Sequence, residues 1–321
     1  MRNLTAKPDL DAYLRLNRAA AGEWQVAIRE LLACDDVGLT LERPQTVAGS
    51  LSSLSVDRGV VCALDLAQDA EVHLCGLPGT LLVVPVSGQC DVLVNGDCGQ
   101  PAFPMAAITS SQAISVRACG QSRLILLNPE QWCGSARPGQ RVLAWMAERV
   151  NHFLLRSNFF QDHNDACAAA DSLFDELDNI AREGGCEPNE TPPELDRRLL
   201  RVIDKIRMEP AWEFDLQELA NHSGVSERNL YYLMKRETGM TPYRFYQRCR
   251  LIRVRRRLVD CQCDVPHISW YAADEGFSHL GRFAALYREH FGELPSETVQ
   301  WRRRLQTGEA ALEAPDRIVA S

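Results

Sequence analysis

The sequence lacks both features that direct a chain to or through a membrane. Its 321 residues contain no run of eighteen apolar residues, the length that a membrane-spanning helix needs. The first residues, MRNLTAKPDLDAYLRLNR, contain no apolar core of the kind found in a signal peptide. We therefore expect a cytoplasmic protein with no membrane partner.

Closely spaced cysteine pairs of the zinc-binding kind are also absent, although the chain has 12 cysteines. No Cys-x2-Cys pair occurs, and structural zinc sites are built from such pairs. We expect buried, reduced thiols, no metal and no cofactor. Cys261 and Cys263 leave a redox role open, but a thiol pair in a cytosolic loop is more often incidental.

The chain has no overall excess of positive charge, and its formal net charge of -8 at first argues against a nucleic-acid partner. The distribution of charge changes this interpretation. Between Ser226 and Arg257 there are 10 Lys and Arg residues against 2 Asp and Glu residues. Because salt screens charges beyond about 10 Å, such a stretch can attract an anionic partner locally, whatever the net charge.

Residues from about 55 to 127 form short apolar runs separated by turn residues, which is typical of a β-barrel or sandwich. The SGQC turn between TLLVVPVSG (80–88) and CDVLVNG (90–96) predicts a hairpin. Between Gly139 and Ala181 the apolar spacing changes to three or four residues and predicts two amphipathic helices. These helices either cover their own domain or pair with a second subunit; the sequence favours neither.

A polar segment rich in Gly and Pro, REGGCEPNETPP (182–193), is typical of an interdomain linker. After it, Leu199, Val202 and Ile203 lie on one face of a predicted helix that begins just past two prolines. The rest of this half is also expected to be helical.

The segment DLQELANHSGVSERNL predicts a helix-turn-helix unit. Asp215 with Glu218 forms a capping box, and Ser226 caps a second helix directly after Gly224, which tolerates the positive φ of a tight turn. The same spacing of small residue, glycine and serine returns 52 residues later at Ala272, Gly276 and Ser278. Two copies separated by the arginine-rich stretch 241–259 are much more specific than one.

These residues resemble the DNA-binding domain of the AraC/XylS family of bacterial transcription regulators. The resemblance is carried by LANHSGVSERNL, MKRETGMTPYRFYQRCRLIRVRRRL and AADEGFSHLGRFAALYREHFGELPSE. The chain departs from the family pattern at Met234, Tyr287 and Tyr271, all apolar or largely apolar exchanges. The strand rhythm and the segment PVSGQCDVLVNGDCGQ of the first half are similar to the family's cupin-like regulatory domain, without its usual Pro-Gly-Asp turn.

The resemblance implies an α+β multidomain protein. Its parts would be an N-terminal cupin-like β-barrel with flanking helices and a C-terminal all-α domain of two helix-turn-helix units joined by a linker helix. The expected limits are 1–181 for the regulatory, effector-binding and dimerisation domain, 182–193 for the linker, 194–304 for the DNA-binding domain and 305–321 for a tail.

The second helix of a helix-turn-helix unit enters the major groove with its N-terminus first. The resulting candidates for base contacts are Arg228, Asn229, Tyr231 and Tyr232 in the first unit and His279 and Arg282 in the second. Leu230 and Leu233 are expected to face inward. The candidates for phosphate contacts, which set register without reading sequence, are Ser226, Lys235, Arg236, Arg244, Ser278 and Arg288.

Two features of the DNA-binding half depart from a simple picture. In the second unit the family's usual reading positions fall on Gly281 and Ala285, whose side chains cannot hydrogen-bond to a base. We therefore expect the first unit to supply most direct readout and the second to contribute phosphate contacts and shape recognition. The arginines at 253 and 255–257 wrap around the connecting helix, and a DNA role and a plain charged surface remain equally open for them.

The function that the resemblance implies is a sequence-specific DNA-binding transcription regulator, an effector-responsive activator and not an enzyme. Its partners would be double-stranded DNA, RNA polymerase, a small-molecule effector and a second copy of the chain. A regulator without a ligand stays open, and the effector is unknown. Inward strand residues would line its pocket, although alternation alone does not identify the inward face; the suggested ones are Leu82, Val84, Leu93 and Ile125.

Two enzymatic alternatives are weaker. A cupin-type metalloenzyme with a DNA-binding appendage would need clustered histidines and carboxylates, yet His73 is the only histidine of the strand region. A repair protein with a reactive cysteine would need a basic, activating neighbourhood around one thiol, which the scattered cysteines do not indicate.

Overall fold

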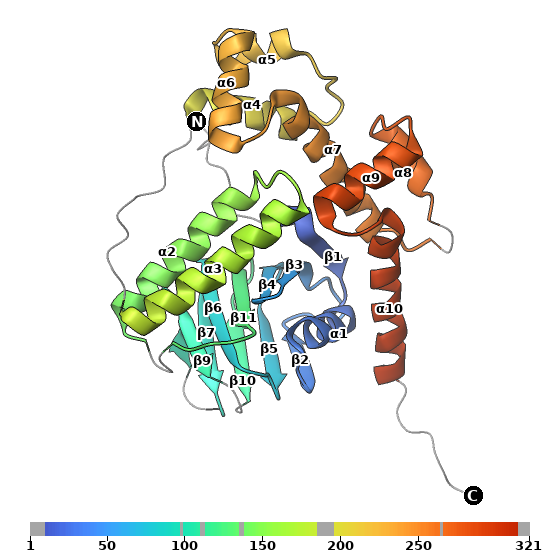
Figure 1. The fold of residues 1–321 in the computed structure, drawn as a ribbon. Helices are drawn as coiled ribbons and strands as arrows, with labels where there is room; N and C mark the ends of the chain where they lie inside the picture. Colours follow the sequence, from blue (N-terminus) through green and yellow to red (C-terminus); the bar gives the residue numbers. More distant parts are fainter. Residues whose placement is uncertain are drawn as a thin grey trace, which may run out of the picture.

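The first half of the chain contains two antiparallel sheets (Figure 1). The computed structural model describes residues 10–96, 99–109, 113–134, 138–184, 196–263 and 266–313, with side chains up to 307. The first sheet consists, in spatial order, of β1 (Leu14–Ala19), β3 (Gly49–Val56), β4 (Gly59–Leu66), β11 (Arg123–Pro129), β6 (Thr80–Ser87) and β9 (Ala106–Thr109). The second consists of β2 (Asp36–Leu41), β5 (Ala70–Cys75), β10 (Ile114–Ala118), β7 (Cys90–Val94) and β8 (Gln100–Pro101).

The predicted hairpin between residues 80–88 and 90–96 is wrong. β6 pairs with β11 and β9 in the first sheet, whereas β7 pairs with β10 and β8 in the second. Gly88, with φ of 82°, lets the chain turn from one sheet to the other. The turn residues therefore mark a corner between sheets. The cupin-like β domain itself is confirmed, as two facing sheets that no pairing among the described strands joins into one ring.

The core between the sheets decides which face of each strand points inward. Leu81 and Val83 of β6 pack there against strands of the second sheet, including Val72 and Leu74. Side chains alternate between the two faces of a strand, so the neighbouring residues point the other way. Leu82, Val84 and Ile125 lie in the core beneath the helices, and Leu93 alternates with the inward-facing Val92. The four suggested pocket residues therefore do not line the space between the sheets.

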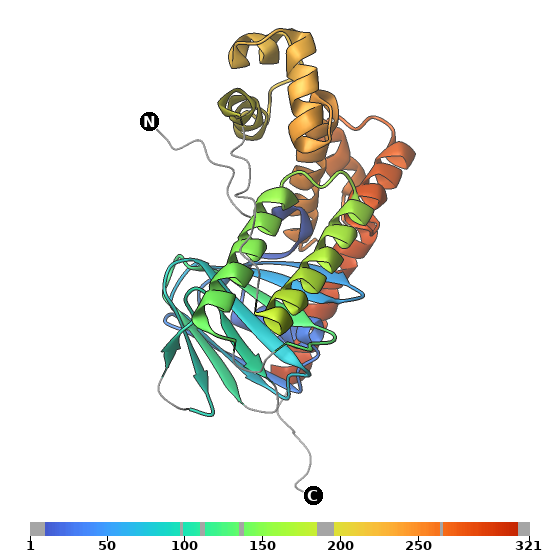
Figure 2. The same ribbon diagram turned by 60° about the vertical axis from the view of Figure 1, so that its left-hand side comes forward.

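The two predicted amphipathic helices are confirmed as α2 (Gln140–Ser157) and α3 (His163–Glu183). They lie side by side over the outer face of the first sheet (Figures 1 and 2). Their apolar stripes are buried against that sheet within the same chain; they include Met146, Val150, Phe153, Leu173, Phe174 and Leu177. Packing on their own domain thus accounts for the sequence pattern, and pairing with a second subunit stays a prediction.

The C-terminal half is helical, as predicted. Its helices are α4 (Arg197–Met208), α5 (Leu216–Ser223), α6 (Glu227–Thr238), α7 (Pro242–Val259), α8 (Ile268–Asp274), α9 (Leu280–Phe291) and α10 (Pro295–Glu313). The pairs α5–α6 and α8–α9 are the two helix-turn-helix units, and α7 joins them. The expected linker lies mostly outside the described residues. The segment expected to begin a tail at residue 305 continues α10 to Glu313.

The two helix-turn-helix units pack differently. The first surrounds a core of its own that includes Leu230, Met234 and Phe245. Phe283 and Tyr287 of the second belong instead to the core that α2, α3 and the first sheet form. Helix α10 runs beside α1 (Ala21–Leu32) and inserts Trp301 into the core between the sheets (Figure 1). No helix in the described part of the chain has the length and apolar composition to cross a bilayer.

Candidate nucleic-acid interface

The first unit has the capping chemistry that its sequence predicts. The Ser226 hydroxyl accepts a hydrogen bond from the Asn229 amide at 3.3 Å, and Gly224 closes the turn with φ of 79°. The Asp215 carboxylate accepts from the Glu218 amide at 3.0 Å and so caps α5. The Glu218 carboxylate pairs with Lys205 at 2.8 Å, so it joins α4 to α5 as well as belonging to the predicted capping box.

The outer face of α6 presents the four candidates for base contacts. Arg228, Asn229, Tyr231 and Tyr232 are exposed, with the two tyrosine side chains at 43% and 57%. The Arg228 guanidinium lies 5.7 Å from the centre of the Tyr232 ring, and the two tyrosine rings meet edge to face. The predicted inward-facing residues, Leu230 and Leu233, are buried. The structure therefore brings the four side chains together on one accessible surface at the start of a helix.

The second unit has the same turn but a different helix start. The Phe277 amide donates to the Ala272 carbonyl at 2.9 Å, as the Val225 amide donates to the Ala220 carbonyl at 3.1 Å. Yet α9 begins at Leu280, its N-cap is His279 in an extended conformation, and no side chain caps it. The expectation that Ser278 caps α9 is wrong, because one extra extended residue places its hydroxyl too early in the chain.

The exposed face of α9 is nearly bare of reading side chains. His279 and Arg282 are exposed, as are Gly281 and Ala285. A Cβ at Gly281 would meet no atom within 4 Å, so packing does not require a glycine there. The exposed faces of α6 and α9 are both accessible to solvent, and they differ in the side chains that they carry.

Three candidates for phosphate contacts are engaged in surface contacts. The Lys235 ammonium donates to the Gly239 carbonyl at 2.7 Å, Arg236 pairs with Glu237 at 2.6 Å, and Arg244 pairs with Glu289 at 2.8 Å. Exposed pairs of this kind contribute about 1 kcal/mol or less, so a phosphate can displace them.

Arg288, the fourth basic candidate, is exposed on α9. In the described part of the chain it has no ion-pair partner. Its guanidinium can therefore meet a phosphate without first giving up a contact.

The arginines of the connecting helix hold the protein together rather than forming a free basic surface. Arg253 pairs with Glu275, Arg256 with Asp11 and Arg257 with Asp274. Arg248, which is not among the predicted site residues, donates to the main-chain carbonyls of residues 157, 158 and 160 at the end of α2. Its i, i+7 spacing with Arg255 was the available signal, since both share one face of α7.

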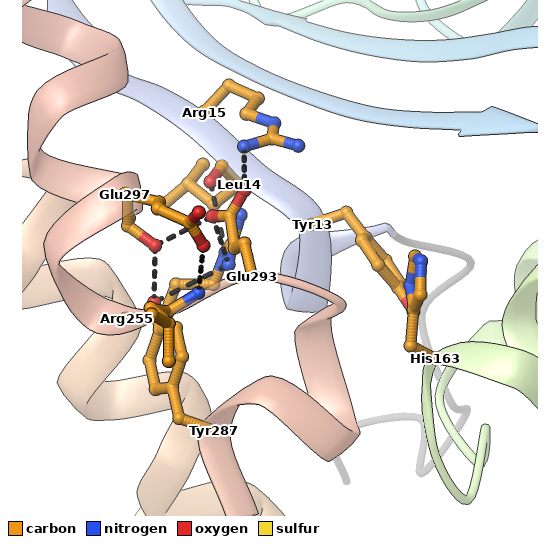
Figure 3. Close-up of polar contacts among 10 residues, drawn as sticks. Tyr13, Leu14, Arg15, His163, Arg255, Tyr287, Glu293 and Glu297 are labelled. Carbon is orange, nitrogen blue, oxygen red and sulfur yellow. Dashed lines mark hydrogen bonds and ion pairs between the residues drawn. The ribbon is translucent and has the colours of Figure 1, made fainter. Parts of the chain in front are cut away.

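A buried ionic cluster joins the second unit to strand β1 (Figure 3). The Glu293 carboxylate pairs with Arg255 at 2.9 Å and with Arg15 at 2.5 Å, and Arg255 also donates to the Leu14 carbonyl. Burial alone would raise the pKa of Glu293, but the Arg255 and Arg15 guanidinium groups outweigh it and lower the pKa to about 2. Glu293 therefore stays ionised, and the Arg255 side chain, fully buried, has a permanent counter-ion.

The histidine and two of the cysteines that bear on the enzymatic alternatives have ordinary structural surroundings. In the described residues no three His, Cys, Asp or Glu side chains gather as metal ligands, and His73 lies 2.7 Å from the Ser115 hydroxyl across the sheet. Burial raises the pKa of the Cys62 and Cys90 thiols to about 12, so these thiols are protonated and weakly nucleophilic.

Comparison with known proteins gives the family. A family model described as "Helix-turn-helix domain" matches residues 219–304. The "XylDLEGF operon transcriptional activator 1" of Pseudomonas putida is 28% identical over 231 residues, which are 70% of this chain and 66% of that protein, so the match spans just under two thirds of the relative.

Two further matches each cover a little over a third of this chain or less. A solved "probable AraC family transcriptional regulator" from Rhodopseudomonas palustris CGA009 has 31% sequence identity over 33% of this chain and 96% of that one, with a TM-score of 0.31. The "XylDLEGF operon transcriptional activator 2" of Pseudomonas putida is 36% identical over 121 residues, 38% of this chain and 73% of that protein. At that identity and coverage, and with the duplicated helix-turn-helix units in place, the chain belongs to the AraC/XylS family of transcription regulators.

Proposed function

We propose that the protein is a sequence-specific DNA-binding transcription regulator whose helices α6 and α9 enter two successive major-groove segments. The observation that carries the proposal is the exposed face of α6, where Arg228, Asn229, Tyr231 and Tyr232 surround a capped helix start. Helix N-termini in the groove place their first two turns against base edges. Two such units joined by one helix would meet segments about one helical turn apart on one face of the duplex.

The two units would divide the work of recognition. Arg228 can pair with the two acceptors of a guanine, a contact that contributes about 1 to 3 kcal/mol of discrimination, and the tyrosines can contact thymine methyls or phosphates. On α9, Gly281 and Ala285 leave Arg282 and Arg288 as the long basic side chains on the exposed surface. The second unit would therefore grip the backbone and respond to the shape of the DNA.

A selection experiment tests this division. The full chain is used to select duplexes from a random library, and each base pair of the selected site is then mutated in turn. We expect most of the sensitivity in the segment that binds α6. Greater sensitivity in the segment that binds α9 would contradict the division, and the failure to select any site would contradict the function.

Two matched variants distinguish base contacts from phosphate contacts. Arg228→Ala is expected to relax the preference at one or two base pairs while changing non-specific binding little. Arg288→Ala is expected to weaken binding to all sequences alike and to reduce the slope of log affinity against log salt by about 1. Equal behaviour of the two variants would argue against the assigned roles.

The regulatory half would make this a cytoplasmic, effector-responsive activator that acts with RNA polymerase, as a monomer or homodimer, and not an enzyme. The relatives named as activators support the positive direction. Because the second unit shares a core with the first sheet, a ligand that changes this core would reach α9 directly. Thermal-shift screening of the full chain against metabolite classes tests the idea, and a chain that no class stabilises would favour a protein partner or no effector.

A further inference from the structure

Three arginines on one face of α7 clasp the second helix-turn-helix unit. Arg250, Arg253 and Arg257 have i, i+3 and i+7 spacing, so they lie in one row along the helix. At about 100° per residue this row is opposite the face that carries Arg248 and Arg255, which bind the regulatory domain. One face of α7 is thus directed to the regulatory domain and the other to α8 and its turn.

Each arginine in the row meets its own part of the second unit. The Arg257 guanidinium pairs with Asp274 at 2.5 Å and lies 5.0 Å from the centre of the Trp270 ring. The Arg253 guanidinium pairs with Glu275 at 2.8 Å, with both side chains largely buried. Together they hold α8 by its outer aromatic residue and by its C-terminal carboxylates.

Arg250 links the second unit to the core of the first through Tyr246, a residue of its own helix. Its guanidinium lies 5.2 Å from the Tyr246 ring and 5.0 Å from the Phe277 ring. Tyr246 belongs to the core of the first unit and donates to the Trp212 carbonyl, whereas Phe277 follows the turn of the second unit. Because Tyr246 anchors α7 in the core of the first unit, a planar guanidinium held between the two rings resists rotation of the second unit about α7.

The turn glycine of the second unit makes room for this contact. A Cβ at Gly276 would lie 1.9 Å from an Arg250 nitrogen, whereas a Cβ at Gly224, the matching residue of the first unit, would meet nothing within 4 Å. Both glycines have positive φ, at 72° and 79°. Gly276 therefore has two roles that Gly224 does not combine: it adopts a left-handed turn, and its missing side chain leaves the space that the Arg250 guanidinium occupies.

We propose that Arg250, Arg253 and Arg257 are positioning residues that fix the orientation of α9 relative to α6 and thereby the spacing between the two DNA segments that the protein accepts. The proposal rests on the proposed function. Helix α7, about 27 Å long at 1.5 Å per residue, sets the distance between the units, and the arginine row sets the rotation of the second unit about it.

The test measures spacing rather than affinity alone. The site selected by the full chain is remade with one base pair inserted between its two segments, which rotates one segment by about 35° relative to the other. The wild-type chain should lose at least about tenfold in affinity, comparable to one mismatched base pair. Arg250→Ala and Arg257→Ala should bind the original site more weakly but lose less than about threefold on insertion.

Two conservative variants separate positioning from a direct DNA contact. Arg250→Lys keeps the charge but not the planar stacking, so it should behave like Arg250→Ala with an unchanged salt slope. Glu275→Gln removes a negative charge, which would strengthen binding if it only freed Arg253 for a phosphate. Positioning predicts the opposite, a weaker and less spacing-sensitive complex. Wild-type spacing preference in Arg250→Lys, or tighter binding by Glu275→Gln, overturns the proposal.

The glycine pair supplies the matched control for folding. Gly224→Ala and Gly276→Ala carry the same φ strain, so both should lower the melting temperature. Only Gly276→Ala should alter the spacing preference. A selected site whose spacing preference is the same in every variant overturns this proposal alone, whereas a chain that selects no site overturns the proposed function together with it.

Discussion

The first helix-turn-helix unit closes around Leu230, Met234 and Phe245, and among the described residues the N-terminal half contributes Phe159 to this core. The second unit buries Tyr287 and Phe291 in a core that it shares with α2, α3 and the first sheet. The same motif is thus a separate unit in one copy and part of a core shared with the β domain in the other. The copy whose exposed helix carries the larger set of long polar and aromatic side chains is the one that packs mainly around its own core.

The largest expected effect comes from removing the buried ion pair that holds α10 to α1. Arg302 pairs with Glu23 at 2.8 Å, with both side chains buried. Arg302→Ala would leave the buried Glu23 carboxylate without its counter-ion, so it should lower the free energy of unfolding by about 3 to 5 kcal/mol. Urea unfolding measures the loss, and hydrogen exchange should show it in α9 and α10 but not in α6.

The control for this variant lies at the start of α4. Arg198 pairs with Asp196 at 2.6 Å on the surface. Arg198→Ala should leave the unfolding midpoint unchanged, because water replaces an exposed pair. An equally large loss in Arg198→Ala would show that the effect of Arg302→Ala does not come from burial of its ion pair, and would break the comparison.

The second prediction concerns acid, which should destabilise the second unit. Burial lowers the pKa of His290 from 6.5 to about 4, and the nearby Arg248 and Arg244 act in the same direction while Asp162 opposes them. The unfolded chain then binds more protons than the folded chain between these values. The contribution of neutral His290 to the free energy of unfolding is fully present above pH 6.5. It falls by up to about 3 kcal/mol as the pH falls to 4.

Replacement of His290 tests whether this residue causes the pH dependence of the unfolding free energy. His290→Gln should flatten the dependence of the unfolding free energy on pH between 6.5 and 4. If His290→Gln keeps the wild-type slope, other groups cause the pH dependence.

A smaller effect separates the two reading faces. Arg228→Ala should cost about 1 to 3 kcal/mol of discrimination at one base pair, whereas Arg282→Ala should weaken binding without relaxing any position. Binding measurements on the selected site and its single-base variants decide this. If Arg282→Ala lost discrimination between base pairs, α9 would also contact bases directly.

The smallest expected effect is at the exposed pair of Arg256 with Asp11. The ion pair joins α7 to the short 3-10 helix at Asp11–Tyr13, at 3.1 Å and with both side chains largely exposed. Arg256→Gln should change the unfolding free energy by less than about 1 kcal/mol. A much larger loss in urea unfolding would mean that the tether between the halves extends beyond the buried residues.

Local chemistry made part of this architecture predictable. Ser226, Asp215 and the turn glycines act within four residues of their own position, so their roles can be inferred without knowledge of the fold. The apolar spacing of α2 and α3 likewise identifies helices before any partner is known. The four candidates on α6 follow from the same local argument, and the structure places all four on its exposed face.

What escaped prediction depends on distant partners. Leu81 and Leu82 are equivalent in an alternating strand, and only the position of the second sheet shows that Leu81 points inward. Arg255 and Arg257 have the same side chain two residues apart, yet one is buried against β1 and the other holds Asp274. The prediction that Ser278 caps α9 failed because the helix begins one residue later than expected, and no residue of the sequence indicates that shift.

The insertion of α10 has a consequence for synthesis. Trp301 and Leu305 complete a core whose other members come mainly from residues 16–126, so they emerge from the ribosome long after the strands that surround them. At roughly 5 to 20 residues per second the sheets wait on the order of ten seconds or more for their last side chains. The β domain should therefore be open to chaperones until α10 has been synthesised, and a truncated chain that stops before α10 should aggregate more readily.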